Sequence, residues 1–156
     1  MMMTAYPVAA EAMDLETYVL AALFAGSNGL RQIEADQRGL RWVRSTFEAS
    51  EVSRRLIGLA VLLRSHLDSG SVKSTARVGH FLPDIANPAI QKDLLLREAC
   101  NKIIHAEDID LHGHEQDSES TPSLSRCIRL RGQWDGKDWQ AEIDVLAFLN
   151  ETCKHS

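Results

Sequence analysis

The sequence predicts a mainly α-helical α+β protein, a four-helix bundle followed by a small antiparallel β-hairpin or three-stranded sheet. Apolar residues recur every three or four positions over most of the first 106 residues. The pattern then changes to alternation around the turn dipeptide Asp135-Gly136. A length of 156 residues suits a single domain, which divides into a helical bundle at 11–106, an acidic loop at 107–125, and a C-terminal hairpin and tail at 126–156.

Four segments carry the helical period, and we expect helices at residues 11–25, 30–47, 50–67 and 89–106. The first is expected to end at Gly26-Ser27-Asn28-Gly29, because glycine and asparagine commonly terminate helices. Ser50 is a typical N-cap for the third helix, and Pro88 suits the start of the fourth. The third helix has the widest apolar stripe and is therefore predicted to be the most buried.

The turn at Asp135-Gly136 fixes one register for the hairpin. One face then pairs Gly132 with Trp139, Leu130 with Ala141 and Ile128 with Ile143, and the other pairs Arg131 with Gln140 and Arg129 with Glu142. This register buries apolar residues and matches opposite charges. Further short elements are predicted at Val78–Leu82 (strand), at Ile109 and Leu111 (strand), and at Val145–Cys153 (closing helix).

Charge and cysteine usage restrict the environment and the partners. The formal net charge is −5, and residues 106–156 hold 11 acidic against 5 basic residues, so a polyanion is expected to meet the first two-thirds of the chain. Three widely spaced cysteines favour reduced thiols and a cytoplasmic location. No apolar run is long enough for a membrane span, and no phosphate-binding or dinucleotide-binding motif is present. We therefore expect no membrane association and no cofactor.

The fourth predicted helix carries the candidate catalytic residues Arg97, Asn101 and His105, with Lys102 beside them. Steps of four residues keep these side chains on one edge of a helix. An arginine that binds phosphate, an amide that orients it and an imidazole that titrates near neutrality suit RNA cleavage through the 2′-hydroxyl. The alternative is structural: Arg97 pairs with a nearby acid (Asp93 or Glu98), Asn101 hydrogen-bonds across the bundle, and His105 caps the helix.

The segment Leu96-Arg97 through Asn101-Lys102-Ile103-Ile104-His105-Ala106 resembles the HEPN superfamily of helical bundles. Ribonuclease members of that superfamily carry an Arg a few residues before a His on one late helix, and the separation between Arg97 and His105 is longer. The resemblance implies a bacterial stress or defence protein that binds RNA or cleaves it without metal as a homodimer. The alternative is a non-enzymatic protein-interaction module that binds a cognate partner.

Arginines surround a tryptophan on the second predicted helix, where Arg38 and Arg41 flank Trp42. Aromatic stacking and phosphate contacts suit single-stranded RNA, and Lys102 would add to this binding set. Arginine and tryptophan are also typical of protein interfaces, so a dimer-facing or solvated surface is the alternative.

The acidic loop holds His112 and His114, which would point to the same side of an extended segment. Such a pair could bind a transition metal together with a carboxylate. No third ligand is identifiable, so a solvated loop is expected and no metal site is predicted.

Overall fold

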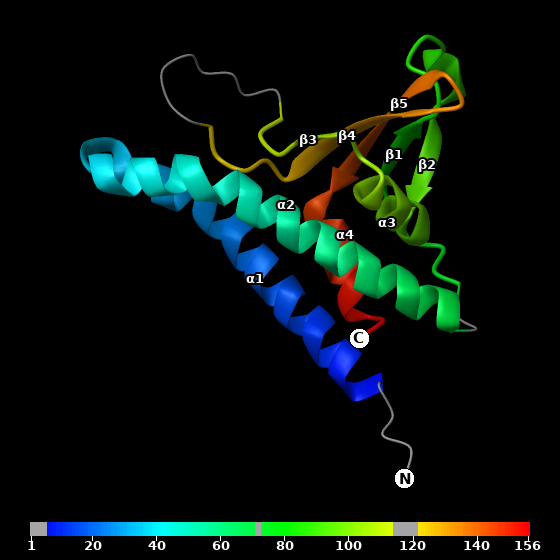
Figure 1. Cartoon of the computed structure of the whole chain (residues 1–156), viewed down its shortest axis with the longest axis horizontal. Helices are drawn as coiled ribbons and strands as arrows, with labels where there is room; N and C mark the ends of the chain where they lie inside the picture. Colours follow the sequence, from blue (N-terminus) through cyan, green and yellow to red (C-terminus); the bar gives the residue numbers. More distant parts are fainter. Residues whose placement is uncertain (1–5, 71–72, 114–121) are drawn as a thin grey trace.

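The computed structural model describes residues 6–70, 73–113 and 122–156, and its fold is α+β. Two long helices, α1 (Tyr6–Ile33) and α2 (Arg38–Ser69), form a hairpin joined by the short 3-10 helix η1 (Glu34–Asp36). The two helices lie close at this turn and separate toward their other ends (Figure 1). We call the turn, residues 30–47, the hairpin tip.

A five-stranded antiparallel sheet follows, in the order β2-β1-β5-β4-β3. Its strands are β1 (Arg77–Leu82), β2 (Lys92–Leu95), β3 (Asp108–Asp110), β4 (Cys127–Trp134) and β5 (Lys137–Asp144). Two short helices, α3 (Leu96–Ile104) and α4 (Val145–Cys153), and the 3-10 helix η2 (Pro88–Ile90) complete the described fold. Helix α3 lies between the sheet and α2, and α4 lies in the opening between α1 and α2 (Figure 1).

The predicted hairpin is confirmed pair for pair, from Cys127 opposite Asp144 to Trp134 opposite Lys137. Asp135 and Gly136 have φ values of 51° and 71°, as a type I′ turn requires. The strand at Val78–Leu82, the strand around Ile109 and the helix at Val145–Cys153 are also present. Strand β3 takes up part of the segment predicted to be an acidic loop.

The predicted four-helix bundle is wrong. Helix α1 continues through Gly26-Ser27-Asn28-Gly29, and α2 merges the expected second and third helices. Ser27 stays helical because its buried hydroxyl donates to Glu48 Oε1 (3.1 Å) and accepts from Leu124 N (2.9 Å). Ser50 is no N-cap, since its hydroxyl donates to the carbonyl of Phe47 within the continuous helix.

The fourth predicted helix is also shorter than expected. Residues 92–95 form β2, which pairs antiparallel with β1, for example His80 with Asp93 and Phe81 with Lys92. Helix α3 begins only at Leu96. The backbone groups of residues 92–95 are satisfied by a strand that is distant in sequence, and this pairing replaces the first helical turns.

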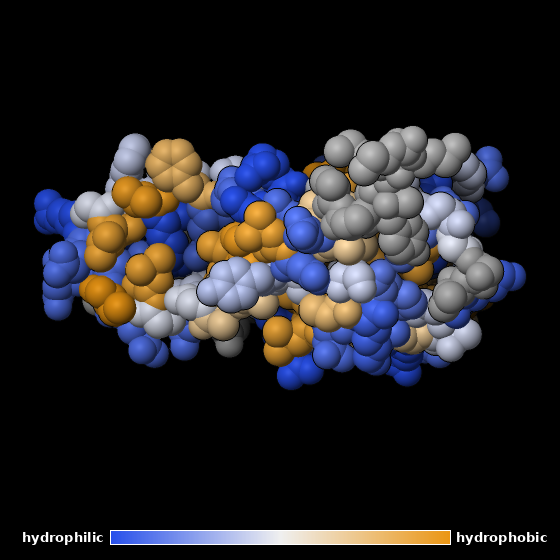
Figure 2. Space-filling model, turned by 90° about the horizontal axis from the view of Figure 1, so that it is seen from below, coloured by the Kyte–Doolittle hydropathy of each residue, from blue (hydrophilic) through white to orange (hydrophobic). Residues whose placement is uncertain are grey.

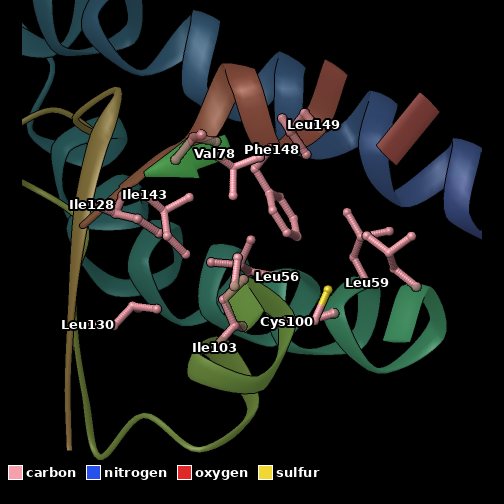
Figure 3. Packing of buried hydrophobic residues seen from close by; sticks show 14 of the residues in the cluster. Leu56, Leu59, Val78, Cys100, Ile103, Ile128, Leu130, Ile143, Phe148 and Leu149 are labelled. Carbon is pink, nitrogen blue, oxygen red and sulfur yellow. The ribbon is translucent and has the colours of Figure 1, made fainter. Parts of the chain in front are cut away.

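One apolar core joins all these elements, and Figure 3 shows side chains from α2, α3, α4 and the strands pointing into it. Leu56 and Leu59 of α2 are fully buried, which confirms the predicted central stripe of residues 50–67. Phe148 of α4 and Cys100 of α3 are buried in the same core, and burial raises the pKa of the Cys100 thiol to about 12. Within the described ranges, no helix has the length and apolar character needed to cross a membrane.

Candidate functional site

A cavity of about 610 Å³ opens between α3, strands β1 and β2 and the end of the β4–β5 hairpin. Three aromatic rings, four basic or imidazole groups and two amides contribute to its wall. The lining residues are Arg64, Phe81, Pro83, Lys92, Glu98, Asn101, Lys102, His105, Gln133, Trp134 and Trp139. With the histidine neutral, three positive side chains face one acid, so the wall is positively charged.

Strand pairing assembles the aromatic part of the wall. Strand β1 pairs with β5 and brings Phe81 to within 6.3 Å of Trp139, measured between ring centroids. The Trp139 ring lies over Gly132, where an added Cβ would come within 2.5 Å of the ring. This glycine is therefore required for the ring to pack flat against β4. Trp134, at the end of β4, is 78% exposed.

Lys102 of α3 lies over the rings of Phe81 and Trp139. Its ammonium is 4.0 Å from the Phe81 centroid and 4.7 Å from the Trp139 centroid, distances at which cations are attracted to aromatic faces. Its Nζ is also 3.5 Å from a Glu98 carboxylate oxygen, and most of the side chain is buried. The rings and the carboxylate thus hold a positive charge at a fixed place in the cavity wall.

Asn101 and His105 line the same cavity as Lys102. The Asn101 Oδ1 atom is buried and accepts no hydrogen bond from any described residue. A buried amide oxygen without a donor costs about 1–3 kcal/mol, so a movement of this side chain that gives the oxygen a donor is favoured. His105 is exposed at the C-cap of α3, and its backbone N–H donates to the Asn101 carbonyl (3.1 Å).

The third candidate catalytic residue, Arg97, lines a neighbouring hollow of about 590 Å³ with Asp68 and Lys73. Its Nε donates to Asp68 Oδ1 of α2 at 2.7 Å. Arg97 therefore pairs with an acid of another helix and not with its sequence neighbours Asp93 or Glu98. The hydrogen bond from Arg97 lowers the pKa of Asp68. The structure therefore brings Asn101 and His105 together and directs the Arg97 guanidinium elsewhere.

The predicted RNA-binding residues also divide between two places. Arg38, Arg41 and Trp42 are exposed at the start of α2 in the hairpin tip, whereas Lys102 lies in the α3 cavity. Arg41 is 23 residues from the cavity residue Arg64 along α2, which corresponds to about 35 Å of helix. These residues therefore do not form one surface.

A buried ion pair holds the hairpin tip together. Arg44 donates to both Glu34 carboxylate oxygens, at 2.7 and 2.6 Å, and also to Glu48 (3.2 Å) and the Pro122 carbonyl (3.1 Å). These hydrogen bonds lower the pKa of Glu34 and raise that of Arg44, despite the opposing effect of burial. Arg44 thus joins η1, α2 and the segment after residue 121, and it is buried whereas Arg38 and Arg41 are exposed.

The histidine pair predicted from the acidic loop is described only in part. His112 Nδ1 lies 3.3 Å from the Ser123 carbonyl oxygen, and His114 lies outside the described residues. Across residues 6–70, 73–113 and 122–156, no three or more His, Cys, Asp or Glu side chains are grouped to hold a metal ion.

Phe81, Lys92 and Arg64 were not predicted as cavity residues. The hairpin tryptophans were expected in the core, which is confirmed for Trp139 and wrong for Trp134. The hairpin register did place Trp139 over Gly132, but no local signal showed that β1 would bring Phe81 alongside.

Comparison of the chain with protein-family models, with curated proteins and with solved structures finds no match. The resemblance to the HEPN superfamily therefore stays a hypothesis that rests on the residues of α3.

Proposed function

We propose that the chain binds single-stranded RNA, with one nucleotide held in the cavity between α3 and the sheet. The observation that supports this most is the combination, in one hollow, of an exposed tryptophan, a fixed lysine and an amide whose oxygen has no hydrogen-bond donor. Single-stranded RNA requires a surface for stacking, positive charge for phosphate and polar groups for base edges.

The base would stack on Trp134, the exposed aromatic residue of the cavity wall. Trp139 and Phe81 are less suited because Lys102 already lies over their rings. Stacking of a base on an aromatic side chain contributes about 1–3 kcal/mol and tolerates any sequence.

The phosphate would lie near Lys102, Lys92 and Arg64, the three positive side chains of the wall. Lys102 is held in place by the rings beneath it, so little side-chain entropy is lost when it meets an anion. Asn101 would turn toward the cavity on binding, so that its Oδ1 accepts from a base amino group or a ribose hydroxyl and gains the donor that it lacks.

The test measures fluorescence anisotropy of a labelled single-stranded RNA of mixed sequence, titrated with the protein in about 50 mM salt. We expect the Lys92→Met and Lys102→Met variants to weaken binding by about fivefold or more, because each loses a phosphate contact. Arg38→Met is the matched control in the hairpin tip and should change affinity less than twofold. A wild-type protein that does not bind RNA, or an equal loss in the control, would overturn the proposal.

Metal-independent RNA cleavage is a second candidate, favoured by His105 at the wall of the same cavity. The same samples, kept in a chelator and run on a denaturing gel, test it directly. Cleavage that is lost in His105→Ala would support catalysis in this cavity. RNA that stays intact after prolonged incubation would contradict catalysis and leave RNA binding as the proposed function.

A further inference from the structure

One face of α1 is exposed and carries no charge. From Thr17 to Leu30 the helix has no Asp, Glu, Lys or Arg residue, although Tyr18 is 72% exposed and Ala22, Gly26 and Gly29 are also at the surface. The opposite face is covered by α2 and α4. Figure 2 shows orange and pale side chains gathered at the hairpin-tip end of the molecule and continuing toward its middle.

The exposed surface of α2 is different, since it carries ion pairs such as Glu51 with Arg54 beside exposed apolar residues such as Val61. A helix face that is exposed to solvent usually carries such charges. An uncharged outer face on α1 is therefore typical of a helix that is covered on both sides.

The residues of this face follow a pattern that is symmetric about position 24. Leu15 and Ile33 lie nine residues either side of it, Tyr18 and Leu30 lie six residues away, and Ala22 and Gly26 lie two residues away. Large apolar residues thus occupy both ends and small residues the centre. No atom lies within 4 Å of a Cβ placed at Gly26 or Gly29, so the centre is open to a close approach.

We propose that α1 packs antiparallel against α1 of a second copy of this chain, with a two-fold axis at position 24. Leu15 then meets Ile33 of the second copy, Tyr18 meets Leu30, and Ala22 meets Gly26. A two-fold interface requires a patch that is complementary to itself. This order of large and small residues meets that requirement. The small central residues let the two helix backbones come close, so the large residues at each end can interdigitate.

Charge selects the antiparallel direction. The first part of α1 carries Glu11 and Asp14 and no basic residue, and at the far end of the patch Arg31 and Arg38 outnumber the exposed acid Asp36. Antiparallel packing brings the acids of one copy toward the arginines of the other, whereas parallel packing would oppose like charges. A second copy is thus favoured as the occupant by pattern and by charge.

The first test compares two glycine substitutions by sedimentation equilibrium of the full chain. Both Gly26 and Gly58 are exposed, helical and free of neighbours within 4 Å, so Gly26→Arg and Gly58→Arg should both fold. We expect wild type and Gly58→Arg to be dimers, and Gly26→Arg to weaken the dimer at least tenfold. A monomeric wild type, or equal weakening by both variants, would overturn the proposal.

The second test fixes the direction of packing. In a background with Cys127 and Cys153 replaced by serine, Leu15→Cys protein is mixed with Ile33→Cys protein and oxidised. We expect disulfide-linked dimers in the mixture and few in Leu15→Cys alone. Efficient cross-linking of Leu15→Cys alone would contradict the antiparallel register. Neither readout depends on RNA, so the proposed RNA binding can fail while this proposal stands.

Discussion

The α3 cavity and the hairpin tip contain the same residue types, tryptophan and basic side chains, in opposite arrangements. In the cavity, Trp139 is 3% exposed and the Lys102 ammonium lies over its ring. In the tip, Trp42 is 63% exposed and packs only edge-on against Phe47, while Arg44 is buried against Glu34. The cavity thus buries Trp139 beneath a charge and exposes Trp134 at its rim, whereas the tip buries the charge of Arg44 and exposes Trp42. A binding site depends on this arrangement more than on composition.

The largest expected contrast is between the two tryptophans. Trp139→Ala should lower the free energy of unfolding by about 3–5 kcal/mol, because it removes a buried ring and leaves a cavity. Trp42→Ala should change it by less than about 0.5 kcal/mol, since the ring is mostly in water. Urea denaturation monitored by circular dichroism measures both. Similar losses of unfolding free energy in the two variants would contradict the contrast between a buried and an exposed tryptophan.

Removal of the buried charge of the tip should have an effect nearly as large. Arg44→Met leaves Glu34 buried without its partner, and breaking one side of a buried ion pair costs about 3–5 kcal/mol. Arg38→Met, an exposed arginine six residues earlier, is the control and should be nearly neutral. A loss below about 1 kcal/mol for Arg44→Met would show that the pair does not hold the tip together.

A single methyl group at Gly132 should disturb the cavity and leave the tip unchanged. Gly132→Ala places a Cβ about 2.5 Å from Trp139 Cζ2, so the ring must move. Overpacking of this kind costs about 1–3 kcal/mol. Tryptophan fluorescence and RNA affinity should both change. A Gly132→Ala variant that keeps wild-type stability would contradict the packing of the Trp139 ring on Gly132.

Acid should weaken the tip in particular. The hydrogen bonds from Arg44, aided by the charges of Arg44, Arg41 and Arg31, hold the pKa of Glu34 below its ordinary value of 4.5. A lowered pKa stabilises the fold above pH 4.5, and this stability is lost as the pH falls through the folded-state value. The wild type should therefore lose more stability between pH 5 and pH 3 than the Glu34→Gln, Arg44→Met double variant. Parallel pH profiles would contradict this account.

Sequence reasoning succeeded where the interacting residues are neighbours along the chain. The register of β4 with β5 follows from Asp135-Gly136 and the alternation beside it, and α4 follows directly after β5. The buried stripe of α2 follows from helical periodicity. Each of these features follows from a pattern that lies within one continuous segment of the chain.

The predictions failed where distant residues decide the structure. Ser27 stays inside α1 because Glu48 and the backbone of Leu124 bind its hydroxyl, and neither partner is near it in sequence. Residues 92–95 form a strand because β1 lies beside them. The cavity was not predicted as a site for the same reason, since Phe81, Lys102 and Trp139 come from three separate elements.

The claim that RNA binds in the cavity and not at the tip is tested most directly by photocross-linking. Ultraviolet irradiation of the protein with single-stranded RNA, followed by mass spectrometry, locates the contacted peptide. We predict cross-links within residues 132–140, which include Trp134 and Trp139, and their loss when unlabelled RNA competes. Cross-links confined to residues 38–47, which include Trp42, would contradict the account and assign RNA binding to the hairpin tip.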